Sequence, residues 1–221
     1  MASLGQAKSL GGVGSILVLI AGFIPSAGFV VAIIGFILIL IAVKYVSDAF
    51  TDRTIFNNMI IAVILAILGF VAFFVAVLGA IYSFVGIGGF SSFMPGTAPS
   101  AGFIALLTSI IIGWVIAWVF FLVGSIFLKR SYDTVAMKLN VGMFHTTGLL
   151  YLIGAALTII FVGLVIVFIA EILQIVAFFS IPEQMPMGPQ PMPGQMGTPP
   201  PPGAMSSVPR KNWFRPAPND P

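Results

Sequence analysis

The 221-residue chain lacks cysteine, and only 7% of its residues are Asp, Glu, Lys or Arg. The absence of cysteine excludes disulfide bonds and any metal or redox site built on thiolates. The shortage of charge excludes an ordinary water-soluble domain, in which about 25% of the residues are charged. The net charge of +3 is small and is divided among short loops, so it does not indicate binding to nucleic acid.

Hydrophobic residues make up 59% of the chain, and they fall in long uninterrupted blocks without the alternation of half-buried strands. Such blocks are typical of helices that cross a lipid bilayer, because a helix satisfies its backbone hydrogen bonds within its own segment. The sequence therefore predicts an all-α, polytopic transmembrane helical bundle. The predicted spans are residues 10–24, 28–43, 59–85, 102–128, 144–160 and 163–181.

Two parts of this predicted arrangement of spans allow a second interpretation. The first apolar run stops at Pro25-Ser26-Ala27-Gly28, which indicates a tight turn between two spans; a signal peptide beginning near Lys8 is the other interpretation. The run from Phe144 to Ile181 would be about 57 Å long as one helix, nearly twice the hydrocarbon thickness. We therefore expect two spans that turn near Phe161-Val162-Gly163, in preference to one long span.

In the six-span arrangement, every Lys and Arg residue lies on the same side of the membrane. By the positive-inside rule, this distribution places both termini and both charged loops in the cytoplasm, and the protein in the cell membrane. A five-span arrangement would export the basic tail. The residues concerned are Lys8, Lys44, Arg53, Lys129, Arg130, Lys138, Arg210, Lys211 and Arg215.

Alignment of the sequence with itself at an offset of about 85 residues indicates a weak internal repeat. This shift pairs Lys44 with Lys129 and Asp48 with Asp133, both at the ends of predicted spans. Each unit then runs as a span, a charged cytoplasmic loop and a second span, and the two units are parallel.

Three stretches of the sequence carry a family resemblance: SLGQAKSLGGVGSILVLI, IAVKYVSDAFTDRTIFNN and AEILQIVAFFSIPE. Together they resemble an archaeal family of integral membrane proteins, the domain of unknown function 996. The resemblance covers about residues 1–183 and leaves the tail outside. It implies an archaeal cell-membrane protein without an assigned activity, and it brings no catalytic or binding residues to this chain.

Glu171 is the acidic residue that lies deepest within an apolar run. A carboxylate near the bilayer midplane costs several kcal/mol, so such a residue usually faces the interior of a bundle and often marks an ion or proton path. Gln174 lies one helical turn away and is the other candidate for this path. The alternative is a structural carboxyl group that is hydrogen-bonded between helices.

A second group of polar residues lies at the predicted cytoplasmic ends of the spans. The i, i+4 spacing of two Lys–Asp pairs favours ion pairs along one face of a helix, and a binding site assembled by the two repeats is the alternative. The sole histidine lies where the fifth span begins, and we interpret it as a residue at the membrane interface. The group consists of Lys44, Asp48, Arg53, Asn57, Lys129, Asp133 and His145.

The tail, residues 184–221, is rich in Pro, Met and Gly. Thirteen of the 16 prolines in the chain lie from Pro182 onward, and this composition cannot support a packed core, so the sequence predicts a disordered tail. Its last segment, PRKNWFRP, combines basic and aromatic residues that suit an anionic membrane surface or a partner groove. A solvated tail without a partner is the alternative.

The sequence contains no motif of a known catalytic, phosphate-binding or metal site, so we expect neither an enzyme nor a cofactor or bound metal. The favoured function is a structural or interaction component of the cell membrane. The alternative is a small ion or solute transporter, or a channel subunit, that uses Glu171. The expected partners are the lipid bilayer, a second copy of the chain and a partner for the tail; nucleic acid is not expected.

Overall fold

A computed structural model describes residues 4–86 and 101–183, and every regular element within these ranges is a helix. The helices are α1 (Leu4–Ala21), α2 (Gly28–Ala49), α3 (Arg53–Gly86), α4 (Ala101–Leu139), α5 (Gly142–Leu157), the short 3-10 helix η2 (Thr158–Ile160) and α6 (Val162–Phe179). In this part of the chain, six helices are long and apolar enough to cross a membrane. The predicted all-α bundle of six spans is therefore confirmed. The predicted disordered tail, 184–221, and residues 87–100, which connect the predicted third and fourth spans, lie outside the described residues.

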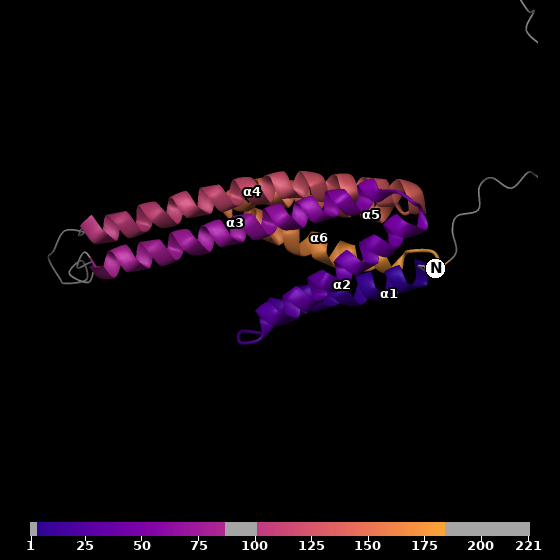
Figure 1. Cartoon of the computed structure of the whole chain (residues 1–221), viewed down its shortest axis with the longest axis horizontal. Helices are drawn as coiled ribbons and strands as arrows, with labels where there is room; N and C mark the ends of the chain where they lie inside the picture. The colour runs from indigo at the N-terminus through magenta and orange to yellow at the C-terminus, as the bar shows by residue number, and fades with distance from the viewer. Residues whose placement is uncertain (1–3, 87–100, 184–221) are drawn as a thin grey trace, which may run out of the picture. The chain divides into compact units, whose positions relative to one another are not determined.

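The helices pack in chain order, and the last packs against the first (Figure 1). Each of α1 to α5 contacts the helix that follows it, and α6 contacts α1. The result is a closed ring of antiparallel neighbours. Because the ring closes between the two ends of the helical region, residues far apart in the sequence come together at its centre.

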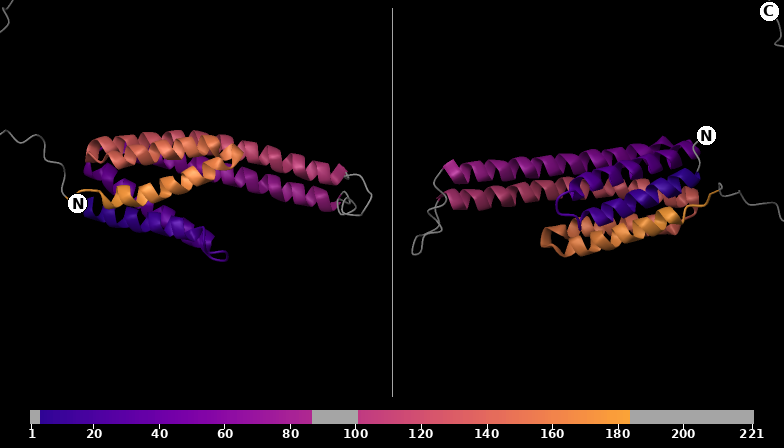
Figure 2. Two further views of the ribbon diagram at one scale, coloured as in Figure 1. Left: turned by 180° about the vertical axis from the view of Figure 1, so that it is seen from behind. Right: turned by 90° about the horizontal axis from the view of Figure 1, so that it is seen from below.

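Two of the helices are much longer than the other four. The 34 residues of α3 and the 39 of α4 correspond to about 51 and 59 Å, whereas helices of 16 to 22 residues reach only about 24 to 33 Å. The outer ends of α3 and α4 therefore run past the turns that join α1 to α2 and α5 to α6, as both views of Figure 2 show.

Two helix junctions have a similar backbone conformation. Between α2 and α3, Thr51 has a φ of 54°, and between α4 and α5, Asn140 has a φ of 55°. Each of these left-handed residues ends a helix that extends well beyond the predicted span. The charged segments that follow the second and fourth predicted spans were expected to be loops, and they are largely helical. The helices continue there because their next apolar residues still pack in the core: Val46 and Val135 are both 1% exposed.

Glycine lets the helices approach closely at two crossings. Where α1 crosses α2, a Cβ on Gly14 would lie 2.6 Å from the carbonyl oxygen of Gly35, and the reverse distance is the same. Where α5 meets α6, a Cβ on Gly163 would overlap the backbone of Gly154 and Thr158. Such close backbone approach is how helices gain contact in lipid, where burying apolar surface supplies no driving force between them.

The buried core lies toward the end of the bundle that carries the charged residues. At its centre, the rings of Tyr132, Phe144 and Phe178 meet edge to face, with centroids 5.6 and 5.2 Å apart. Ile55 and Met59 of α3 belong to the same cluster. Elsewhere the large apolar side chains are exposed on the outer surfaces of the helices, as expected for a surface that faces lipid.

Candidate functional site

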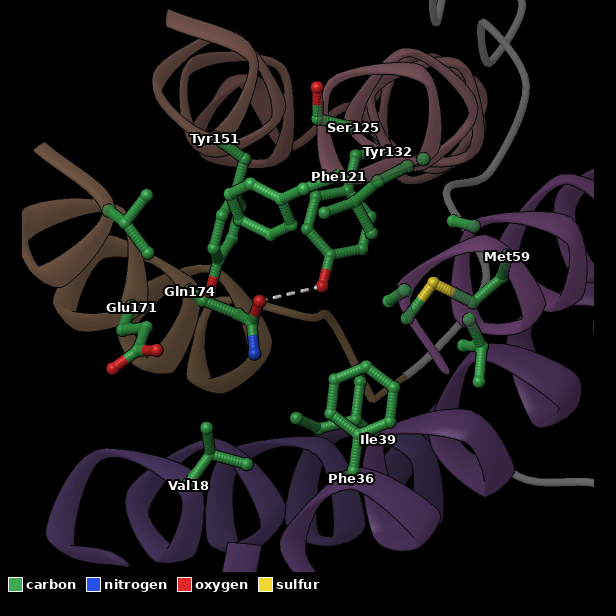
Figure 3. A pocket seen from close by; sticks show the side chains of 16 residues that line it. Val18, Phe36, Ile39, Met59, Phe121, Ser125, Tyr132, Tyr151, Glu171 and Gln174 are labelled. Carbon is green, nitrogen blue, oxygen red and sulfur yellow. Dashed lines mark hydrogen bonds between the residues drawn. The ribbon is translucent and has the colours of Figure 1, made fainter. Parts of the chain in front are cut away.

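A cavity of about 260 Å³ lies between the six helices, and each helix contributes to its wall. Most of the lining is apolar, with Val18 of α1, Ile39 of α2 and Met59 of α3 among the residues (Figure 3). The polar side chains all come from the second half of the chain. They are Ser125 and Tyr132 of α4, Tyr151 of α5, and Glu171 and Gln174 of α6.

Glu171 lies in the middle of α6 and is only partly buried. Figure 3 shows its carboxyl group at one side of the cavity, away from the amide of Gln174. In the ranges 4–86 and 101–183, no ion pair includes Glu171; the cations that form ion pairs there are all at the charged end of the bundle. The Glu171 carboxylate thus lines the cavity, and no described residue supplies it with a counter-ion.

Gln174 belongs to a chain of hydrogen bonds that crosses the bundle. The Tyr132 hydroxyl donates to Gln174 Oε1 at 2.8 Å, Gln174 Nε2 donates to Ser15 Oγ at 2.9 Å, and Ser15 Oγ donates to the carbonyl of Gly11 at 2.8 Å. The three side chains are 0%, 5% and 1% exposed. Each buried polar group is thus satisfied, and the chain connects α4, α6 and α1.

Sequence reasoning identified Glu171 and Gln174 as candidates for one ion or proton path. In the structure, Gln174 bonds to Tyr132 and Ser15. Ser15 was missed. Its available signal was that a polar residue interrupts an apolar run at this position. Tyr132 was missed because it falls in a segment expected to be a loop; it is in fact in α4. Its contacts depend on the packing of distant helices, for which the sequence carries no signal.

The predicted cytoplasmic cluster is brought together only in part. Asp133 of α4 lies between two basic groups: its Oδ1 is 2.7 Å from His145 Nδ1, and its Oδ2 pairs with Lys129 one turn earlier. The cluster therefore connects the end of α4 to the start of α5. His145, which the sequence suggested as an interfacial residue, is also a partner of Asp133.

The other predicted members of that cluster are not joined to it. In the described part of the chain, Lys44 and Asp48 form no ion pair, and neither does Arg53. Asn57, the remaining predicted member, lies in the first turns of α3. The predicted pair at the end of α2 is thus absent, while the equivalent pair at the end of α4 forms.

Asp52 was not predicted, and it organises the start of α3. Its Oδ1 accepts hydrogen bonds from the hydroxyl and the amide of Thr54, at 2.6 and 3.1 Å, and its Oδ2 is 3.5 Å from Lys138 Nζ. The hydrogen bonds from Thr54, and then the charge of Lys138, hold the pKa of the Asp52 carboxyl below its usual range. Asp52 therefore acts as an N-cap that also ties α3 to α4.

A second hollow, of about 340 Å³, lies along α3 and α4 near the turn between α5 and α6, and its lining includes Trp114 and Trp118. Trp118 Nε1 donates to the carbonyl of Ala155 at 3.0 Å, whereas Trp114 stacks on Phe161 and its buried Nε1 has no hydrogen-bond partner among the described residues. Its lining carries no ionisable group, so it offers packing surface and no acid–base or ion-binding chemistry.

The arrangement of charged residues bears on metal binding. Over the described ranges, no group of three or more His, Asp and Glu residues is placed to hold a metal ion. The chemistry available in the cavity is therefore that of a single carboxylate, an occupied amide, hydroxyl groups and aromatic rings.

Comparison with known proteins agrees with the resemblance seen in the sequence. The model of the family described as protein of unknown function (DUF996) matches residues 31–172. An uncharacterised protein of Methanocaldococcus jannaschii is 34% identical over 182 residues, which cover 82% of this chain and 95% of the relative. No solved structure matches the chain. The chain is thus a multi-pass membrane protein that belongs to the DUF996 family.

Proposed function

We propose that the protein binds a cation in the central cavity and carries it across the cell membrane, with Glu171 as the binding group. The observation that supports this function is the position of the Glu171 carboxyl group, which lines a cavity shared by all six helices. A structural carboxyl group would have a hydrogen-bond or ion-pair partner in another helix, and in the described residues no ion pair engages it. The geometry thus favours the carrier over the structural component.

Two further features of the ring of helices support a carrier. A carboxylate in the middle of a span is stabilised by facing a cavity, not lipid. The hydrogen-bonded chain through Gln174 connects three of the helices around the cavity, so their positions are coupled. We propose that this protein is not an enzyme, that both termini are cytoplasmic, and that the cation enters from one side of the membrane at a time.

Two substitutions of glutamate test the proposal, because the chain contains only two glutamates. Glu171→Gln keeps the shape of the side chain and removes its charge. Glu183→Gln makes the same change at a site outside the helices, where the side chain is 77% exposed and lies 3.9 Å from Lys8. Both proteins are reconstituted into liposomes, and the flux of protons, Na⁺ and K⁺ is compared with that of empty liposomes.

We expect the wild type to carry at least one of these ions or an organic cation, with a flux that Glu171→Gln abolishes and Glu183→Gln preserves and with all three proteins equally helical. Flux that survives Glu171→Gln would contradict the role of the carboxylate. Wild-type liposomes that match empty ones for these ions and for organic cations would contradict transport itself.

A structural or interaction role in the membrane is the second proposal, and a specific feature favours it. The outer parts of α3 and α4 extend past the other helices and expose Phe74, Leu78 and Ile81 of α3. This hairpin offers an apolar surface to a second copy of the chain. Measurement of the oligomeric mass in mild detergent tests it: a monomeric mass would contradict self-association.

A further inference from the structure

The cavity around Glu171 has a composition that does not suit a bare divalent metal ion. Ca²⁺ takes about six to eight oxygen ligands, and Mg²⁺ requires a near-octahedral set. Among the described residues that line the cavity, Glu171 is the one anionic group. A divalent ion would therefore keep an uncompensated positive charge in largely apolar surroundings.

The remaining surface of the cavity suits an apolar body that carries a positive charge. Aliphatic side chains from α1, α2 and α3 form one part of the wall, and aromatic rings form another: those of Phe36, Phe121, Tyr132 and Tyr151. The faces of aromatic rings attract cations and are the usual recognition element for quaternary ammonium groups. None of the described Lys and Arg residues lines the cavity, so the ligand itself is expected to supply the counter-charge for Glu171.

From this juxtaposition, we propose that the cavity binds a small monovalent organic cation with an apolar body, such as an alkylammonium or a quaternary ammonium compound. The carboxylate of Glu171 provides the opposite charge, the aromatic rings contact the cationic head, and the aliphatic wall contacts the body. A volume of about 260 Å³ lies just below the range of about 300–1,000 Å³ for ligand pockets, so the ligand is small. This inference rests on the proposed function, because it names the class of cation carried.

Binding of benzyltrimethylammonium to the full-length protein in detergent micelles tests the proposal by calorimetry. Its uncharged carbon isostere, neopentylbenzene, has the same shape and serves as the matched control for charge. We expect saturable binding of benzyltrimethylammonium and no competition by Na⁺. Glu171→Gln weakens this binding by about tenfold or more, because one partner of a desolvated charge pair is lost, while Glu183→Gln leaves it unchanged.

A second variant keeps the test valid should Glu171→Gln fail to fold. Phe121→Leu replaces an aromatic ring with an aliphatic group, and it weakens binding of the cation by about threefold, the loss expected for one cation–π contact. Binding of neopentylbenzene does not change between wild type and Glu171→Gln. Equal affinity for the cation in wild type and Glu171→Gln would overturn the proposal, as would absence of binding.

The outcome also separates this inference from the proposed function. Glu171-dependent flux of Na⁺ or protons without any binding of benzyltrimethylammonium would overturn the organic-cation class and leave the carrier function standing. Absence of both flux and binding would overturn both.

Discussion

The replacement of Gly35 by alanine tests the close crossing of α1 and α2, and Gly79→Ala in α3 is the matched control. A Cβ at position 35 would lie 2.6 Å from the carbonyl oxygen of Gly14 and 2.9 Å from the Cβ of Leu17. At position 79, a Cβ would meet no atom within 4 Å. Both glycines lie inside helices, so the two substitutions differ only in the space around them.

The magnitude follows from two effects on the free energy of unfolding. Replacing glycine with alanine inside a helix stabilises it by about 0.8–1.0 kcal/mol, and both variants share this gain. Inserting a methyl group into a tightly packed contact costs about 1–3 kcal/mol, and only Gly35→Ala bears this cost, because the atoms it meets include backbone. We therefore expect Gly35→Ala to be less stable than Gly79→Ala by about 1–3 kcal/mol.

The assay is reversible unfolding of the full-length protein in mixed micelles, followed by circular dichroism as the fraction of denaturing detergent rises. Comparing the two variants with each other removes the shared helix-propensity gain. Equal stability of the two variants would refute the close crossing, and a Gly35→Ala protein more stable than Gly79→Ala would refute it more strongly.

Four further predictions concern the polar groups, the topology and the tail. Tyr132→Phe and Gln174→Leu, made singly and together, should give a coupling free energy of about 0.6–1.7 kcal/mol, as for hydrogen bonds between membrane helices; additive effects would argue against the bond. The pKa of Asp52 is lowered by its hydrogen bonds, so its contribution is complete above the unfolded pKa of about 3.9 and is lost as the pH falls through the folded value. Asp52→Ala should therefore lower the unfolding midpoint near neutral pH and should differ less from wild type in strong acid; the same difference at every pH would contradict this. Reporter fusions after Thr97 and at the C-terminus should report opposite sides of the membrane, and the same side for both would rule out the proposed topology. Truncation after Glu183 should leave helicity and melting unchanged, since the composition of the tail cannot support a core; a large loss of thermal stability would show that the tail packs on the bundle.

Much of the architecture is readable from the sequence because the bilayer acts on each segment by itself. A run of apolar residues long enough to cross the hydrocarbon becomes a helix regardless of its neighbours. This is why the spans, and the turn near Phe161, were predicted: Phe161 has a φ of 63° and separates α5 from α6. The sequence prediction ended α2 and α4 too early, because charged residues mark the end of a membrane span while the helix itself can continue.

Only part of the candidate site could be predicted from the sequence, because the site depends on contacts between distant segments. Glu171 and Gln174 stand out because ionisable and amide groups are costly in the middle of an apolar run. Their partners do not stand out, since Gln174 is separated from Ser15 by 159 positions and from Tyr132 by 42. Such pairs depend on which helices become neighbours, and apolar surfaces of similar composition do not specify their own neighbours in lipid.

The sequence by itself determined the class of protein, the six spans and the two deep polar residues of α6, because these depend on local hydropathy and charge. Only the tertiary structure decided that α6 closes the ring against α1, that Tyr132 and Ser15 hold Gln174, and that Glu171 is left to face a cavity. The physical reason is that lipid selects helices one at a time, whereas close packing and buried hydrogen bonds select the arrangement of all six together.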